Sequence, residues 1–167
     1  MKVASNSGPI IHLARIKQLS LLKDLYGEVH ITEAVKREAV DRGKGEGFPD
    51  ALLIEGGIKE GWIKVTKAKT VGKGFSRFGL HSAEAQIVSY SLEEKCDLLL
   101  LDDDAARELA RTLGLKVRGS IGVLVEGIKN KKISIKSGLS SLDELAEAMY
   151  ISREVYREAR EIIEKLK

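Results

Sequence analysis

Three consecutive aspartates, Asp102, Asp103 and Asp104, follow directly after a run of four leucines in this chain. Such an apolar run is typical of a strand that is buried on both faces, so we expect the aspartates at the carboxyl end of a central parallel strand. Adjacent carboxylates repel one another, and a divalent cation that prefers oxygen ligands would relieve that repulsion. The alternative is that Asp102 or Asp103 caps the helix expected to begin near Ala105, although a cap needs only one side chain.

Other polar residues are expected near the same edge of the sheet. Asn6 and Ser7 follow the first expected strand, and Ser120 follows the last one. Glu84 falls in the first turn of a helix, where the helix dipole favours a carboxylate whatever its function. Glu38 lies on a helix rich in basic residues, so a surface ion pair would explain it equally well. The two glutamates gain significance only if the fold brings them to the cleft that holds the aspartates.

The elements that must position these residues alternate between short strands and helices. Strands are predicted at 2–5, 28–32, 62–66, 97–101 and 115–118. Helices are predicted after the turn at 6–9 and at 19–26, 33–42, 50–59 with an interruption at Gly56-Gly57, 82–94, 104–113, 120–129, 141–149 and from Ser152 onward. Residues 43–47 are predicted to be a flexible loop, and residues 67–78 to be irregular and mobile. This order predicts an α/β fold, a three-layer α/β/α sandwich around a mostly parallel sheet, with the C-terminal helices appended.

The composition fits one ordinary globular domain. The chain has 167 residues, 32% of them charged, and a formal net charge of +3, which permits an anionic partner without demanding one. The single cysteine, Cys96, excludes a disulfide framework and a cysteine-based zinc cluster. We expect a cytoplasmic location with no membrane association, since no signal peptide or apolar run of spanning length is evident. The scarcity of Asn and Gln beside abundant Lys, Arg and Glu favours a thermophile source.

Two other α/β classes are disfavoured by local sequence. A response-regulator receiver needs an acidic pair soon after the first strand, where this chain has Asn6, Ser7 and Gly8. A P-loop nucleotide-binding protein needs a Gly-x-x-x-x-Gly-Lys-Ser/Thr loop after a strand, and the glycines at 43, 45 and 47 follow a helix instead.

The chain resembles the PIN-domain family, and in particular a poorly characterised prokaryotic and archaeal branch similar to VapC toxins. The resemblance rests on VASNSGPIIHLARI at 3–16, VHITEAVKREAV at 29–40, YISREVYREA at 150–159 and, most specifically, SAEAQIVSYSLEEKCDLLLLDDDAARELARTLGLKVRGSIGVLVEGIKNKKI at 82–133. It covers nearly the whole chain, with residues 43–78 the least matched. It implies a PIN-like nuclease domain at 1–135, with residues 136–167 a helical extension of the same domain.

The resemblance further implies a metal-dependent ribonuclease that cleaves single-stranded RNA with Mg²⁺ or Mn²⁺. Position by position, the metal ligands fall on Asn6, Glu38, Glu84, Asp102 and Asp103, of which Glu38, Glu84 and Asp103 are the catalytic residues. The chain departs from the family at Asn6, where an amide replaces the first acid and supplies no negative charge, and at Ser82, where relatives often have a Gly-Glu pair before the alanine. Metal affinity should therefore be lower than in a relative with the full acidic set.

Contacts with the RNA backbone are expected from hydroxyls and cations beside the cleft. The candidates for phosphate or RNA binding are Ser7, Ser120, Lys67, Lys69, Lys73, Arg77 and Arg107. The basic run that also includes Lys64 contains no acid, and Phe75 and Phe78 within it could stack on bases, although a solvated mobile loop explains it equally well. For Arg107, an ion pair with Asp103 is slightly favoured over phosphate. The three histidines, His12, His30 and His81, lie in no motif and are interpreted as surface or packing residues.

Two functions remain open from the sequence. The first is an active ribonuclease, for which the resemblance also allows the role of a homodimeric toxin in a toxin–antitoxin pair, with a cognate antitoxin protein as partner. The second is a degenerate domain that binds RNA or protein without cutting, which the neutral side chain of Asn6 allows.

Overall fold

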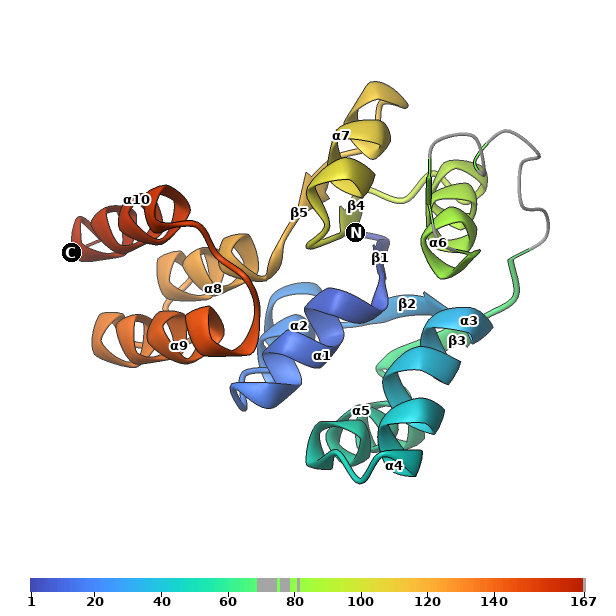
Figure 1. Cartoon of the computed structure of the whole chain (residues 1–167), viewed down its shortest axis with the longest axis horizontal. Coiled ribbons are helices and arrows are strands. Elements are labelled where there is room, and N and C mark those ends of the chain that lie inside the picture. Colours follow the sequence, from blue (N-terminus) through green and yellow to red (C-terminus); the bar gives the residue numbers. More distant parts are fainter. Residues whose placement is uncertain (69–74, 76–78, 81, 167) are drawn as a thin grey trace.

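The computed structural model describes residues 1–68, 75, 79, 80 and 82–166 (Figure 1). Its sheet has five parallel strands in the order β3-β2-β1-β4-β5. The strands are β1 (Val3–Ser5), β2 (Val29–Thr32), β3 (Ile63–Thr66), β4 (Leu98–Leu100) and β5 (Val117–Arg118). The helices are α1 (Ser7–Arg15), α2 (Ser20–Tyr26), α3 (Glu33–Lys36), the π-helix η1 (Arg37–Arg42), α4 (Gly43–Gly45), α5 (Pro49–Glu60), α6 (Ser82–Glu93), α7 (Asp104–Thr112), α8 (Ser120–Lys129), α9 (Ile135–Ala148) and α10 (Arg153–Glu164).

The core has two parts, one on each face of the sheet. Val3 and Leu100 belong to the larger cluster, which also contains residues of α1, α2, α5 and α8. Their neighbours Ala4 and Leu99 belong to a second cluster with residues of α6 and α7. Successive residues of a strand point to opposite faces, so each central strand contributes to both clusters. The predicted three-layer α/β/α sandwich is confirmed.

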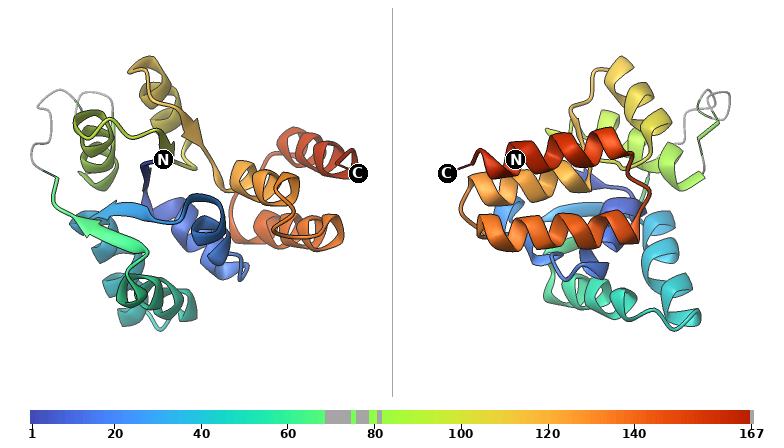
Figure 2. Two further views of the ribbon diagram at one scale, coloured as in Figure 1. Left: turned by 180° about the vertical axis from the view of Figure 1, so that it is seen from behind. Right: turned by 60° about the vertical axis from the view of Figure 1, so that its left-hand side comes forward.

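The two C-terminal helices extend the larger layer. Helices α8, α9 and α10 lie side by side beyond β5 (Figures 1 and 2). Leu142 and Leu145 of α9 and Ile163 of α10 are fully buried and belong to the larger cluster. No helix in the described part of the chain is long and apolar enough to cross a membrane.

Three element predictions were wrong in detail. Residues 43–47 are not simply a loop, because η1 and α4 prolong the preceding helix through Gly45. Gly56-Gly57 does not interrupt α5; a Cβ at Gly57 would lie 2.7 Å from Ile63 Cδ1, so this glycine lets the helix pack closely on β3. Helix α9 begins at Ile135 rather than Ser141, with Ser134 as its cap. Most of 67–78 lies outside the described residues.

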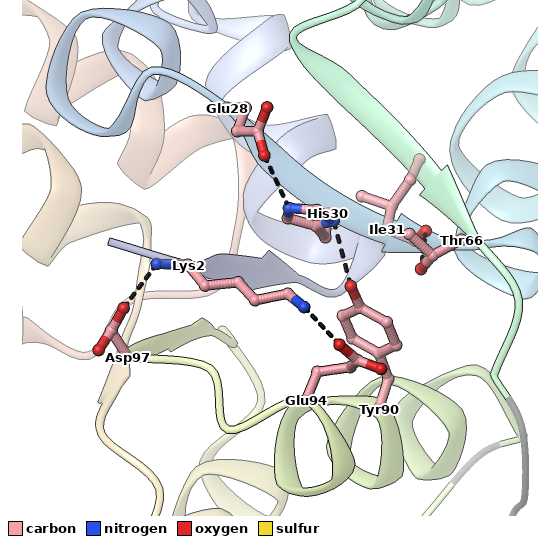
Figure 3. Close-up of polar contacts among 8 residues, drawn as sticks. All are labelled: Lys2, Glu28, His30, Ile31, Thr66, Tyr90, Glu94 and Asp97. Carbon is pink, nitrogen blue, oxygen red and sulfur yellow. Dashed lines mark hydrogen bonds and ion pairs between the residues drawn. The ribbon is translucent and has the colours of Figure 1, made fainter.

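A polar cluster fastens α6 to the strands beneath it (Figure 3). The Lys2 ammonium donates to Glu94 at 2.5 Å and lies 5.6 Å from the centre of the Tyr90 ring. The Tyr90 hydroxyl lies 3.1 Å from Nδ1 of His30, whose Nε2 lies 3.1 Å from Glu28. These contacts fix the helix that carries Glu84.

Candidate functional site

The site lies where the chain changes direction across the sheet. The first three strands proceed from β1 to one edge, and β4 then pairs on the other side of β1. In open parallel sheets, ligands bind at the carboxyl ends of the two strands that flank such a switch point. Asn6 follows β1 there, and Asp102 follows β4 after Leu101. A Cβ at Gly8 would lie 3.5 Å from the Cβ of Asp102, so the first turn of α1 packs against this aspartate.

Asp102 is held by three hydrogen-bond donors. Its Oδ1 accepts from the Ser120 backbone N–H at 2.7 Å, and its Oδ2 accepts from the Ser120 hydroxyl at 2.6 Å. Nδ1 of His12 lies 2.6 Å from the same Oδ2. Burial by itself would raise the pKa of Asp102, but the hydrogen bonds from His12 and Ser120 outweigh it and hold the pKa below its ordinary value. Asp102 is therefore a buried, ionised carboxylate that ties α1 and α8 to the end of β4.

The side chain of Asn6 has a free acceptor. Asn6 is 7% exposed, and its buried amide oxygen has no hydrogen-bond partner in the described part of the chain. Asn6 occupies the N-cap position of α1, where a side-chain oxygen ordinarily accepts from the second or third residue of the helix. Here the third residue is Pro9, which has no N–H to donate. The oxygen is thus left available for another ligand.

Glu38 reaches the same edge from the next strand along. The Ser7 hydroxyl donates to Oε2 of Glu38 at 2.7 Å, which joins the start of α1 to η1. Glu38 is exposed and sits in a π-helical turn, a distortion that is frequent at functional sites. Ser7 and Glu38 line a hollow of about 430 Å³ together with Arg15, Arg42 and Asp50, among others.

The aspartate triplet is divided among three roles. Asp102 is engaged as described, and Asp103 caps α7, its Oδ1 accepting from the Ala106 N–H at 2.8 Å. Asp104 is fully exposed and lies 3.7 Å from Nη1 of Arg107. The predicted pairing of Arg107 with Asp103 was therefore wrong. Asp103 caps α7 with one carboxylate oxygen, and Asp104 presents its carboxylate to Arg107 from one helical turn away.

The acids are not gathered into a ready cluster. Glu84 lies half-buried in the first turn of α6, which packs on β1 and β2. Among the described residues, no group of three or more His, Cys, Asp or Glu side chains is placed to hold a metal ion. The available side chains still suit a hard cation, because they offer carboxylate and amide oxygens. The oxygen of Asn6, which has no hydrogen-bond partner among the described residues, could act as one of the ligands. The fold thus supplies suitable oxygens at the switch point without a closed ligand cage.

The basic run is only partly described. Lys67 is exposed just beyond β3, whereas Lys69, Lys73, Arg77 and Phe78 lie outside the described residues, as does His81. Phe75 is partly buried and packs against the cluster beneath α6 and α7.

Sequence reasoning missed His12. Interpreted as a surface or packing residue, it is instead a direct partner of Asp102. The only local signal was that His12 shares a helix face with Gly8, four residues earlier, and this does not point to Asp102. The Cβ position of Gly8 lies 3.7 Å from Cε1 of His12, an ordinary van der Waals distance, so the imidazole packs beside Gly8 where it contacts Asp102.

A family model described as a PIN domain matches residues 2–165, almost the whole chain. The chain belongs to the PIN-domain family. PIN domains are generally nucleases that use divalent metal ions, and the parallel sheet with polar residues at its switch point is consistent with a nuclease-type fold. Comparisons with curated proteins and with solved structures gave no match.

Proposed function

We propose that this PIN domain hydrolyses phosphodiester bonds in single-stranded RNA with the help of Mg²⁺ or Mn²⁺. The observation that carries the proposal is the buried, partnerless amide oxygen of Asn6 at the switch point of the sheet. An unsatisfied buried acceptor costs free energy, and a bound cation would remove that cost. Membership of a nuclease family supports the same reaction class.

Asn6, Glu38, Glu84 and Asp103 would hold the ion, with Asp102 adding negative charge behind them. Once bound, the ion would lower the pKa of a coordinated water and neutralise charge on the phosphate. The Ser7 hydroxyl holds the Glu38 carboxylate so that its other oxygen can orient the attacking water. His12 and Ser120 keep Asp102 ionised and in place. Arg107 and the N-terminus of α8 offer donors to a phosphate.

The direct test is cleavage of labelled single-stranded RNA in Mn²⁺ by the wild type and by Asp103→Asn. Asparagine also caps helices, so the variant retains α7 while losing the charge. We expect the wild type to cut and the variant to be slower by roughly 10- to 100-fold or more. Asp24→Asn, which removes an exposed carboxylate on α2, serves as the control and should cut like the wild type.

A second function, a PIN domain that binds RNA or protein without cutting it, is favoured by two observations. Asn6 brings no charge, and both oxygens of Asp102 already accept hydrogen bonds from the protein. Several RNAs bound by the wild type but left intact in Mn²⁺ would establish this function and exclude the nuclease.

For the biological setting, we propose a cytoplasmic toxin paired with an antitoxin protein and acting as a homodimer. Family membership motivates the toxin role, and the exposed Ile162 on α10 supports a dimer contact through the C-terminal helices. Sedimentation equilibrium of the wild type and of Ile162→Glu tests the dimer. A monomeric wild type would exclude it.

A further inference from the structure

A second hollow adjoins the site on the β5 side. Its volume is about 320 Å³, and it lies between the start of α8, the first turn of α7 and the connection from α9 to α10. Asp102 and Ser120 line both this hollow and the site at the switch point. A molecule bound here would therefore lie directly beside the proposed catalytic edge. Its volume is at the lower end of the range for small-molecule sites.

One wall of the hollow carries an arginine with spare donors. Among the described residues, the buried Nε of Arg107 has no hydrogen-bond partner, and its Nη1 makes a 3.7 Å contact with Asp104, a fully exposed carboxylate. Such an exposed pair is worth little, so a stronger acceptor can replace it. Nη1 also lies 3.6 Å from the Cβ position of Gly119, which places the guanidinium at the start of α8. A phosphate at this point would meet Arg107 and the N-terminal end of α8 together.

Another part of the lining is apolar and includes an exposed aromatic ring. Met149, Ile151 and Val155 line it, and Tyr150 beside them is 91% exposed. An aromatic side chain so fully in water gains nothing from burial in the folded chain. Beside an apolar wall it offers a face on which a nucleobase can stack.

We infer that this hollow binds one nucleotide of the RNA strand, its base stacked on Tyr150 and its phosphate on Arg107. The inference rests on the proposed function for its substrate class. Asp102 and Asp104 also line the hollow, and Asp104 lies beside Arg107, so a phosphate bound by Arg107 has to displace the exposed Asp104 carboxylate. The base takes the Tyr150 side, where the lining is apolar. A nucleotide held in this way positions the neighbouring phosphodiester at the switch point.

The inference is tested by binding alone, without cleavage. Fluorescence anisotropy of a labelled eight-nucleotide RNA in EDTA would compare the wild type with Tyr150→Ala, Tyr150→Phe and Arg107→Gln. Loss of one stacked base predicts binding weaker by roughly 5- to 100-fold for Tyr150→Ala, with Tyr150→Phe close to the wild type. Arg107→Gln should weaken binding and lower the slope of log affinity against log salt by about one. Because Tyr150 is exposed, its replacement leaves the fold intact.

Matched controls are available on the same molecule. Arg111→Gln removes the same charge one turn further along α7, and Leu52→Ala removes an exposed apolar side chain from α5. Arg111→Gln should weaken RNA binding less than Arg107→Gln, and Leu52→Ala should weaken it less than Tyr150→Ala. Wild-type affinity in Tyr150→Ala, or an equal loss in Tyr150→Phe, would overturn the inference.

Two further outcomes distinguish a site for an RNA nucleotide from a site for a free nucleotide, and RNA binding from RNA cleavage. Competition by a free nucleoside monophosphate as strong as by the RNA would assign the hollow to a free nucleotide instead of a strand. Binding is measured in EDTA, so it does not depend on cleavage. An RNA that binds through Tyr150 but is never cut in Mn²⁺ would contradict the nuclease proposal and would still support the nucleotide site.

Discussion

Asp102 illustrates how one buried carboxylate can organise a site at the scale of a single residue. Its side chain is 9% exposed and accepts three hydrogen bonds, which come from α1 and from the start of α8. Those bonds stabilise the charged form, so the carboxylate contributes to folding only while it is ionised. Replacing Asp102 should therefore lower the free energy of unfolding by an amount that depends on pH.

Asp102→Asn should unfold more easily than the wild type by about 1–3 kcal/mol near neutral pH, because the amide leaves buried donors unpaired. The folded-state pKa of Asp102 lies below its ordinary value of 3.8, so the stabilisation is complete above that value and is lost as the pH falls through the folded-state pKa. The difference between the two proteins should shrink correspondingly in acid. Urea unfolding at a series of pH values from 7 to about 2 would measure it, and a constant difference would contradict this role.

Asn6→Asp restores the acid that the family has at this position. It should make the metal-free protein less stable and should increase its affinity for metal. Without metal, the new carboxylate is buried near Asp102, and the melting temperature should fall by an amount equivalent to about 1–3 kcal/mol. With Mn²⁺, the added charge should strengthen binding and raise the melting temperature more than in the wild type. Thermal unfolding in EDTA and in Mn²⁺ measures both effects. An equal response of the two proteins to Mn²⁺ would contradict a ligand role for position 6.

The sequence was informative about single residues where local chemistry decides their role. An aspartate cap for α7 was foreseeable, and Asp103 fills it. The pairing of His12 with Asp102 was not, because the two residues are 90 positions apart and become neighbours only when β1 and β4 pair.

At the scale of elements, periodicity and composition predicted the sheet well. The run of four leucines gave β4, whose strand residues are all buried, and the pairing of β4 beside β1 is parallel. The start of α9 was predicted wrongly because two capping signals compete there. Ser141 and Glu144 have the spacing of a capping box, but Ser141 is buried inside the helix and accepts from Gln18, while Ser134 makes the cap.

Gly138 should be intolerant of a side chain because α9 lies close to α8 at this point. A Cβ there would lie 2.3 Å from Cδ1 of Ile128, and Gly138→Ala should destabilise the fold by about 1–3 kcal/mol. Gly56→Ala is the matched control, since no atom of the described residues lies within 4 Å of its Cβ position and α5 should gain about 0.5–1 kcal/mol. Urea denaturation should show that Gly138→Ala lowers the free energy of unfolding and that Gly56→Ala raises it. Destabilisation of equal size would contradict the close packing of α9 on α8.

At the scale of the whole molecule, the C-terminal helices α9 and α10 share one hydrophobic cluster with the rest of the domain. Leu142, Leu145 and Ile163 belong to the same buried cluster as Val3 and Leu13. This supports our proposal that residues 136–167 are an extension of the domain formed by 1–135, and the family match through residue 165 agrees with it.

The overall architecture was predictable because strand and helix patterns are local and their order restricts the topology. The positions of the individual side chains around the switch point were harder to predict. Glu38 and Glu84 lie on helices whose exact rotation depends on a π-helical turn and on packing over β1 and β2. No local pattern in the sequence encodes that rotation.

The most direct test of the metal proposal is calorimetric titration of Mn²⁺ into the wild type and into the double variant Glu38→Gln/Glu84→Gln. Glu60→Gln, which alters an exposed carboxylate on α5, is the control. We predict saturable binding to the wild type and the control, and binding at least about tenfold weaker in the double variant. Absence of binding to the wild type, or equal affinity in the double variant, would contradict a metal site at the carboxyl edge of this sheet.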